Sequence, residues 1–369
     1  MTEAGKPCHF GGAFCFGELG SDMSRKLIVV GNGLGMALDN TKFSLPHAMP
    51  KVWHEKLERN ERELIADFIP GIDVSTGPQE ESRLINAQVA LSAFDILQSG
   101  FGHDYAKNLK EWFSKPNQHT DLENALNKFT FEVAREFDKT SETFYDDEKL
   151  KNFWRNLKAH LRTHKSHIAT FNYDTALYTK YLDDTFFKEK TVLQDCFRSG
   201  FLKPTLGKVE CERGLYLHLH GSPLFHDTIQ KRNRNELNSH TEESRNHIIL
   251  SDASLKPLLI AKSKILSLYW KRLEEILHPD VRDTTILQVE EIILFGYRGG
   301  DDHLNRLIGK SGCPVRVVEW CDDHILPDRE EWWKDKLGAT NVIVDLRKNI
   351  LTFKEWDSRP TESKMEDDA

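Results

Sequence analysis

The sequence predicts an α/β protein: a Rossmann-like, doubly wound and mostly parallel sheet that carries a large helical insertion. Short apolar runs rich in branched residues alternate with segments of helical spacing, the pattern of a parallel sheet covered on both faces. The first run, 26–30, stops at the glycine-rich turn Gly31–Gly35. A strand followed by such a turn is typical of the start of a nucleotide-binding domain.

The later elements are predicted from the same two periodicities. Within residues 51–162 the spacing of apolar residues predicts helices over 52–68, 81–98, 122–137 and 149–161, with breaks at 70–71 and 100–102. Further strands are predicted over 167–171, 215–219, 248–250, 291–295, 315–319 and 341–344. A long helix is predicted over 255–277, and the polar stretch 231–246 is predicted to be a loop.

These patterns divide the chain into four parts. Residues 1–22 are an expected flexible leader without the basic and apolar regions of a signal peptide, and Met23 offers an alternative start. Residues 23–50 and 163–347 form the predicted Rossmann-like domain, and residues 51–162 form the helical insertion. Residues 348–369 are the C-terminal segment, and its last part, 357–369, is expected to be a disordered acidic tail.

Composition excludes several classes of protein. With 50 basic against 58 acidic residues the net charge is -8, so direct nucleic-acid binding is not predicted. No run approaches the roughly 20 apolar residues of a membrane span. The cysteines form no Cys-x-x-Cys pair, which argues against a zinc ribbon and indicates free thiols in a reducing cytoplasm.

Two short motifs follow predicted strands about fifty residues apart. One is Thr170-Phe171-Asn172-Tyr173-Asp174, and the other is His218-Leu219-His220-Gly221-Ser222. Because parallel strands end at the same rim of a sheet, an amide, a carboxylate and an imidazole converge there. That set suits cleavage of a glycosidic bond in a nucleotide better than hydride transfer.

The polar residues in these motifs can also be explained by purely structural roles. Asp174 is read first as a cap for the turn that follows, whereas Asn172 has no such structural role and can hold a water or a ribose hydroxyl. His218 shares a strand face with His220. His220 is preferred as general base because Gly221 follows it directly and ends the strand.

Two glycine turns complete the set of candidate site residues. The turn from Gly31 to Gly35 suits a pyrophosphate or, equally, a tight strand–helix connection without ligand. No acidic residue follows about 20 residues later, which argues against a standard dehydrogenase. In the late motif, Gly296 permits close approach of a ligand, and Asp301 either caps the following helix or binds a ribose hydroxyl.

The four motifs, in this order, resemble the sirtuin-like superfamily, in particular bacterial sirtuin-like NAD hydrolases of anti-phage defence. The similarity runs from about residue 27 to residue 307 and is interrupted by the helical block. Three features depart from it. The four zinc-binding cysteines of protein-deacylating sirtuins are absent, no Asp-Phe-Arg occurs near Phe43-Ser44-Leu45, and Arg298 stands where the late signature has serine.

The resemblance implies hydrolysis of NAD to nicotinamide and ADP-ribose, without a metal, as an NAD-depleting effector of abortive infection. It implies that Asn172 positions the water or ribose and that His220 is the general base. The residues expected to contact NAD are Gly31, Asn32, Gly33, Leu34, Asp174, Gly296, Tyr297 and Asp301.

An unrestrained NAD hydrolase would kill its own cell, so a trigger is expected. The resemblance suggests a homo-oligomer or a partner such as a HerA-type ATPase, an Argonaute-like protein or a phage protein. A catalytically silent NAD or ADP-ribose sensor or scaffold is the alternative, and an NAD-dependent protein deacylase is a weaker one.

Overall fold

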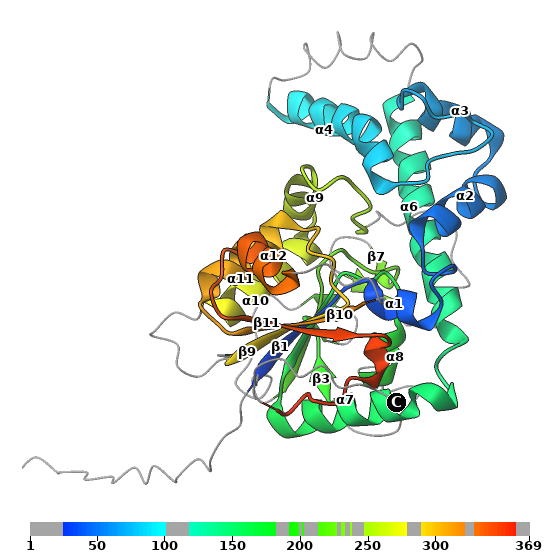
Figure 1. Cartoon of the computed structure of the whole chain (residues 1–369). Coiled ribbons are helices and arrows are strands. Elements are labelled where there is room, and N and C mark those ends of the chain that lie inside the picture. Colours follow the sequence, from blue (N-terminus) through cyan, green and yellow to red (C-terminus); the bar gives the residue numbers. More distant parts are fainter. Residues whose placement is uncertain are drawn as a thin grey trace, which may run out of the picture.

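The fold is built on a parallel sheet of seven strands within the described residues of the chain (Figure 1). The computed structural model describes residues 25–100, 118–181, 192–198, 201–202, 213–226, 230–232, 237, 247–278, 289–321 and 328–358. In spatial order the strands are β11 (Val342–Arg347), β10 (Val315–Trp320), β9 (Glu291–Phe295), β1 (Lys26–Val30), β2 (His167–Thr170), β6 (Gly214–His218) and β3 (Leu193–Gln194). Every neighbouring pair is parallel, which confirms the predicted Rossmann-like α/β fold class.

The strand order reverses beside β1. From β1 the chain first builds outward through β2 to β6 and β3, and it later returns to the other side of β1 with β9, β10 and β11. Ligands of open α/β sheets bind outside the carboxyl ends of the strands at such a switch point. The switch point between β1 and β9 is where the first and the last glycine turn begin.

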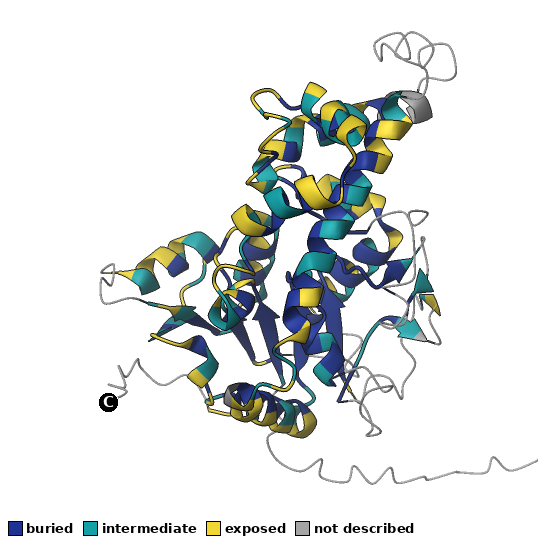
Figure 2. Cartoon of the chain, turned by 90° about the vertical axis from the view of Figure 1, so that its right-hand side faces the viewer, coloured by how far each residue is buried: buried dark blue, intermediate teal, exposed yellow. Residues whose placement is uncertain are grey.

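Alternation along β1 explains why helices cover both faces of the sheet. Leu27 and Val29 belong to one apolar cluster, and Ile28 and Val30 belong to the other. The helices on the first face are α10 (Lys264–Leu277), α11 (Asp302–Ser311) and α12 (Arg329–Leu337). The second face is covered by α1 (Gly33–Leu38), α7 (Lys151–His164), α8 (Ala176–Tyr181) and the 3-10 turn η5 (Ile350–Thr352). The strands are consequently buried between two layers of helices whose outer surfaces are exposed (Figure 2).

A helical subdomain with its own core stands at one end of the molecule (Figure 1). It consists of α2 (Leu45–Glu55), α3 (Arg59–Asp67), the 3-10 turn η1 (Glu81–Leu84), α4 (Ile85–Gly100) and the long helix α6 (Gln118–Glu142). Large apolar side chains such as Trp53 and Phe129 fill this core. Its contact with the rest of the protein includes Leu250, which is fully buried in the same cluster, and Tyr173.

The position of α7 differs from the predicted division at residue 162. The short turn η2 (Glu148–Leu150) precedes it, and Phe153, Leu157 and Leu161 recur every four residues on one side of the helix. That stripe packs with Ile28 and Phe295 of the sheet, because an amphipathic helix buries its apolar side on the largest available core. The structure therefore groups α7 with the sheet, and the helical subdomain ends with α6.

Three predicted elements differ locally from the structure. Residues 52–68 form the end of α2 and all of α3, because Glu58 begins α3 with a capping box to Glu61. Residues 255–277 form α9 (Lys256–Lys262) and α10, because Ser263 is extended and its hydroxyl caps α10. Residues 248–250 form no strand, since beyond β6 a single backbone hydrogen bond joins Ile249 to His220.

A second, antiparallel sheet of very short strands was not predicted. Within the described residues it contains β4 (Phe197–Arg198), β5 (Phe201–Leu202), β8 (Gln230–Lys231) and β7 (Phe225–His226). The predicted leader at 1–22, the acidic tail beyond 358 and most of the loop at 231–246 lie outside the described residues. Among the described helices, none combines the length and apolar character needed to span a membrane.

Candidate functional site

The two glycine turns at the switch point lie directly against each other. The N–H of Gly31 donates to the carbonyl of Phe295 at 3.0 Å, and the N–H of Gly33 donates to the carbonyl of Gly296 at 2.8 Å. A Cβ on Gly33 would lie 2.5 Å from the Cα of Gly296, and Gly296 has a positive φ of 58°. Glycine is therefore required here for backbone contact between β1 and β9, whether or not a ligand binds.

The side chains of Asn32 and Leu34 are already used within the fold. The Nδ2 of Asn32 donates to the carbonyl of Phe43 at 3.0 Å, which fastens the first turn to the start of the helical subdomain. Leu34 is buried in the apolar cluster on the second face of the sheet. A nucleotide at this turn would consequently meet backbone groups rather than these two side chains.

Asn172 is the most unusual polar residue at the carboxyl edge. Its backbone N–H donates to the Thr170 hydroxyl at 3.0 Å, which turns the chain sharply after β2. The residue is 4% exposed, yet neither its Oδ1 nor its Nδ2 has a hydrogen-bond partner among the described residues. Because buried polar groups are nearly always paired, an amide with both atoms open indicates a place prepared for a ligand or a water.

His220 forms a buried pair with Asp301. Its Nε2 lies 3.1 Å from Oδ2 of Asp301, while Oδ1 of the same carboxylate accepts the N–H of Leu304 and caps α11. Burial lowers the pKa of His220, and the hydrogen bond and charge of Asp301 partly offset that effect. Burial alone would raise the pKa of Asp301, but the hydrogen bond and charge of His220 lower it to about 2. The pair therefore holds an oriented imidazole that can accept a proton.

Tyr297 fixes the loop that presents Asp301. The Asp301 N–H donates to the Tyr297 hydroxyl at 2.9 Å, and that hydroxyl bonds Oδ1 of Asn305 at 3.0 Å. The Tyr297 ring stacks on Phe171 at a centroid distance of 5.4 Å, and the rings of Phe171 and His220 form a T-shaped pair at a centroid distance of 4.5 Å. Tyr297 thus serves as a support for the pair, and its hydroxyl is already occupied.

The alignment of β2 and β6 brings the two motifs together. Thr170 is paired with His218 in the ladder, and the N–H of Leu219 donates to the Thr170 carbonyl at 2.9 Å beyond it. Asn172 and His220 each follow two residues after these paired strand ends. The amide of Asn172, the imidazole of His220 and the Asp301 carboxylate therefore gather at one edge of the sheet.

Asp174 caps the next helix and has an unusual pKa. Its Oδ1 accepts the N–H of Ala176 at 3.0 Å, in agreement with the capping interpretation. Burial, together with the negative charge of Asp138, raises the pKa of Asp174 to about 6. The carboxyl therefore keeps its proton to a higher pH than an ordinary aspartate does, and its position two residues after Asn172 keeps it close to the candidate site.

The two histidines of the second motif have different surroundings. His218 is completely buried among Tyr178, Tyr216 and other aromatic rings, and burial lowers its pKa well below the usual value. His220 instead faces Asp301. The geometry therefore separates a core histidine from one that has an acidic partner at the edge of the sheet.

Sequence reasoning missed three supporting residues. Asp138 on α6 accepts both the N–H and the hydroxyl of Thr175, and Asn305 supports Tyr297. Phe171, although part of a recognised motif, was not predicted to contact His220. The sequence offered a signal only for Phe171, which stands between two motif residues. Asp138 is far from the motifs in sequence, and Asn305 lies inside a helix.

No protein-family model matches the chain, and no curated protein matches it at a significant level of similarity.

Proposed function

We propose that this protein is an NAD glycohydrolase, which cleaves the nicotinamide–ribose bond to give nicotinamide and ADP-ribose. The observation that carries the proposal is the unpartnered, buried amide of Asn172 at the same sheet edge as the His220–Asp301 pair. The topological switch point beside β1, where open α/β sheets bind ligands, and the sequence resemblance to sirtuin-like NAD hydrolases support it.

In the proposed reaction the bond between the ribose C1′ and the nicotinamide nitrogen breaks first. Its electron pair neutralises the pyridinium, so nicotinamide leaves uncharged and the ribose becomes an oxocarbenium-like centre. Asn172 orients the ribose or the attacking water through donor and acceptor at once. Water adds to C1′, and its proton passes to the neutral imidazole of His220, whose new positive charge is stabilised by Asp301.

We place this activity in NAD-depleting defence of bacteria against phage, with low basal turnover and a separate trigger. The helical subdomain is the proposed surface for assembly or for an activating partner, because it joins the site through Tyr173. The Tyr173 hydroxyl donates to the carbonyl of Ile249 at 2.7 Å, next to the backbone bond from Ile249 to His220.

The direct test is nicotinamide release from NAD by purified protein at high concentration. Asn172→Ala and His220→Ala are expected to abolish release, while the exposed controls Asn60→Ala and His54→Ala are expected to retain it. Release that survives both site substitutions would refute the assignment. If the unchanged protein shows no turnover even with candidate partners added, while NAD still raises its melting temperature, a silent sensor would be favoured instead.

A second variant separates the role of Asp301 from its cap. Asp301→Asn keeps an oxygen for the N–H of Leu304 but removes the charge beside His220. Turnover is expected to fall by about 10²–10⁴-fold. The acid limb of the pH–rate profile is expected to move to lower pH, because the lost carboxylate no longer raises the pKa of His220.

Asp302→Asn is the matched control for that variant. Asp302 is the next residue, is mostly exposed and pairs with Lys336 at 3.0 Å away from His220. It is expected to leave both turnover and the pH profile unchanged. Equal effects of the two substitutions would show that Asp301 acts only through the local fold.

A further inference from the structure

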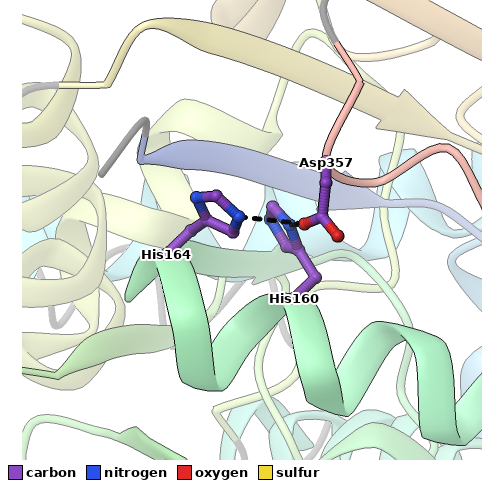
Figure 3. Close-up of side chains that lie close together, drawn as sticks. All are labelled: His160, His164 and Asp357. Carbon is purple, nitrogen blue, oxygen red and sulfur yellow. Dashed lines mark hydrogen bonds and ion pairs between the residues drawn. The ribbon is translucent and has the colours of Figure 1, made fainter. Parts of the chain in front are cut away.

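Two histidines and an aspartate meet at the opposite edge of the sheet from Asn172. His160 and His164 are one helical turn apart on α7, so their rings lie on the same side of the helix and stack at 4.8 Å. Asp357, from the segment after β11, places one carboxylate oxygen 2.6 Å from Nδ1 of His160 and 3.0 Å from Nε2 of His164 (Figure 3).

This arrangement has the composition and size of a transition-metal site. One nitrogen from each imidazole and one carboxylate oxygen all lie within 4.8 Å of one another. Two imidazoles and a carboxylate are a known ligand set for Zn²⁺, with a fourth position left for water. Because Asp357 is two-thirds exposed, its carboxylate can turn slightly aside to admit an ion between the three atoms.

The surroundings of His160 prepare it as a ligand. Its other ring nitrogen, Nε2, lies 2.9 Å from the Ser166 hydroxyl, which itself accepts the backbone N–H of Lys26 at 2.9 Å. Such a second partner is typical of metal-binding histidines, because it fixes the ring.

Two basic side chains hold the segment that carries Asp357. The ammonium of Lys26 lies 2.6 Å from Glu291 and donates to the carbonyl of Ser358 at 2.8 Å. Arg316 pairs with the same glutamate at 2.8 Å and also bonds Ser358. These contacts hold the segment around Ser358 against the sheet, so Asp357 is delivered to α7 at a defined place.

We propose that His160, His164 and Asp357 bind a divalent transition-metal ion, with Zn²⁺ the best fit, which clamps the C-terminal segment onto α7. The site is structural. Because α7 enters β2 at its amino end, whereas Asn172 follows the carboxyl end, the ion lies a full strand length from the proposed catalytic edge.

The test uses the full-length, untagged protein, freed of metal and titrated with Co²⁺ as a spectroscopic probe for Zn²⁺. The expected result is one equivalent bound with the visible absorption of tetrahedral Co²⁺, and a melting temperature that Zn²⁺ raises. His164→Ala and Asp357→Ala are expected to lose both signals, and the exposed control His54→Ala to keep them. Ser166→Ala is expected to weaken binding by about 10–100-fold.

The outcomes are distinct from those of the NAD assay, because metal binding is read without substrate. No Co²⁺ absorption in the unchanged protein would overturn the proposal, and so would binding that persists in His164→Ala and Asp357→Ala. Both of these substitutions are at side chains that are at least partly exposed, so a folded variant is expected and can be verified by circular dichroism.

Discussion

The amide of Asn172 is a local source of instability. Leaving a buried polar group unpaired costs about 1–3 kcal/mol, and proteins retain such groups where a ligand completes them. The hydrogen bond from the backbone N–H of Asn172 to the Thr170 hydroxyl holds the main chain of the residue in place.

This cost gives a prediction that is independent of turnover. Asn172→Leu, which replaces the amide by an apolar group of similar size, is expected to raise the free energy of unfolding by about 1 kcal/mol. Asn305→Leu is the matched control and is expected to destabilise, since that amide bonds both Tyr297 and the Gly299 carbonyl. Urea denaturation measures both, and a destabilised Asn172→Leu would show that the amide is satisfied in solution.

Asp174 provides a prediction of pH dependence. Its pKa rises from 3.8 to about 6 on folding, chiefly through burial, so the folded state holds its proton more tightly than the unfolded state. The contribution of this group to the free energy of unfolding is therefore present in full below about pH 4, and it is lost as the pH rises through about 6. Two pKa units correspond to about 3 kcal/mol.

Asp174→Asn, which keeps the capping oxygen, is expected to remove that loss. Measured by urea denaturation, the stability of the variant relative to the unchanged protein should grow by roughly 3 kcal/mol between about pH 4 and pH 8. Asp121→Asn, on the exposed start of α6, should show no such trend. Parallel pH curves for Asp174→Asn and the unchanged protein would contradict the raised pKa.

At the scale of elements, the strands that sequence predicts best are those buried on both faces. Runs such as Lys26–Val30 and Glu291–Phe295 are continuous and apolar because two helical layers cover them. The two-residue strands β3, β4, β5, β7 and β8 carry no periodicity and were not predictable. The break at Ser263 was also missed, because no proline or glycine marks it.

The candidate site was predictable as a set of strand ends but not as a set of contacts. Asn172 and His220 follow recognisable strands, so their place at one edge follows from parallel topology. The bond between His220 and Asp301 joins residues 81 positions apart and depends on where α11 begins after the glycine turn. Sequence patterns do not fix such a distance.

The contact between the first and last glycine turns is expected to be intolerant of any side chain. Gly33→Ala would place a methyl group 2.5 Å from the Cα and 2.6 Å from the carbonyl oxygen of Gly296, with only backbone to move. The expected loss of stability is about 1–3 kcal/mol.

Gly300→Ala is the matched control, because no atom lies within 4 Å of the added methyl. Its effect on the urea midpoint is expected to remain within about 0.5 kcal/mol. If Gly33→Ala had the same midpoint as Gly300→Ala, the two turns would not be in contact in solution.

At the scale of the whole molecule, the helical subdomain is joined to the candidate site by polar contacts as well as by packing. Asp138, near the end of α6, accepts the N–H of Thr175 at 3.1 Å and also its hydroxyl. Thr175 lies between Asn172 and α8, so a displacement of α6 moves the loop that carries the amide. An activator that binds the helical subdomain could therefore act on the site by displacing α6 and, with it, the loop that carries Asn172.

Asp138→Ala tests that coupling. The substitution leaves the buried N–H and hydroxyl of Thr175 without this acceptor, and the expected loss of stability is about 1–3 kcal/mol. Faster hydrogen exchange is expected over residues 172–176, with a fall in nicotinamide release. Asp121→Ala, exposed on the first turn of the same helix, is expected to change none of these. If Asp138→Ala lost stability while exchange over 172–176 stayed unchanged, the subdomain would stabilise the fold without controlling the site loop.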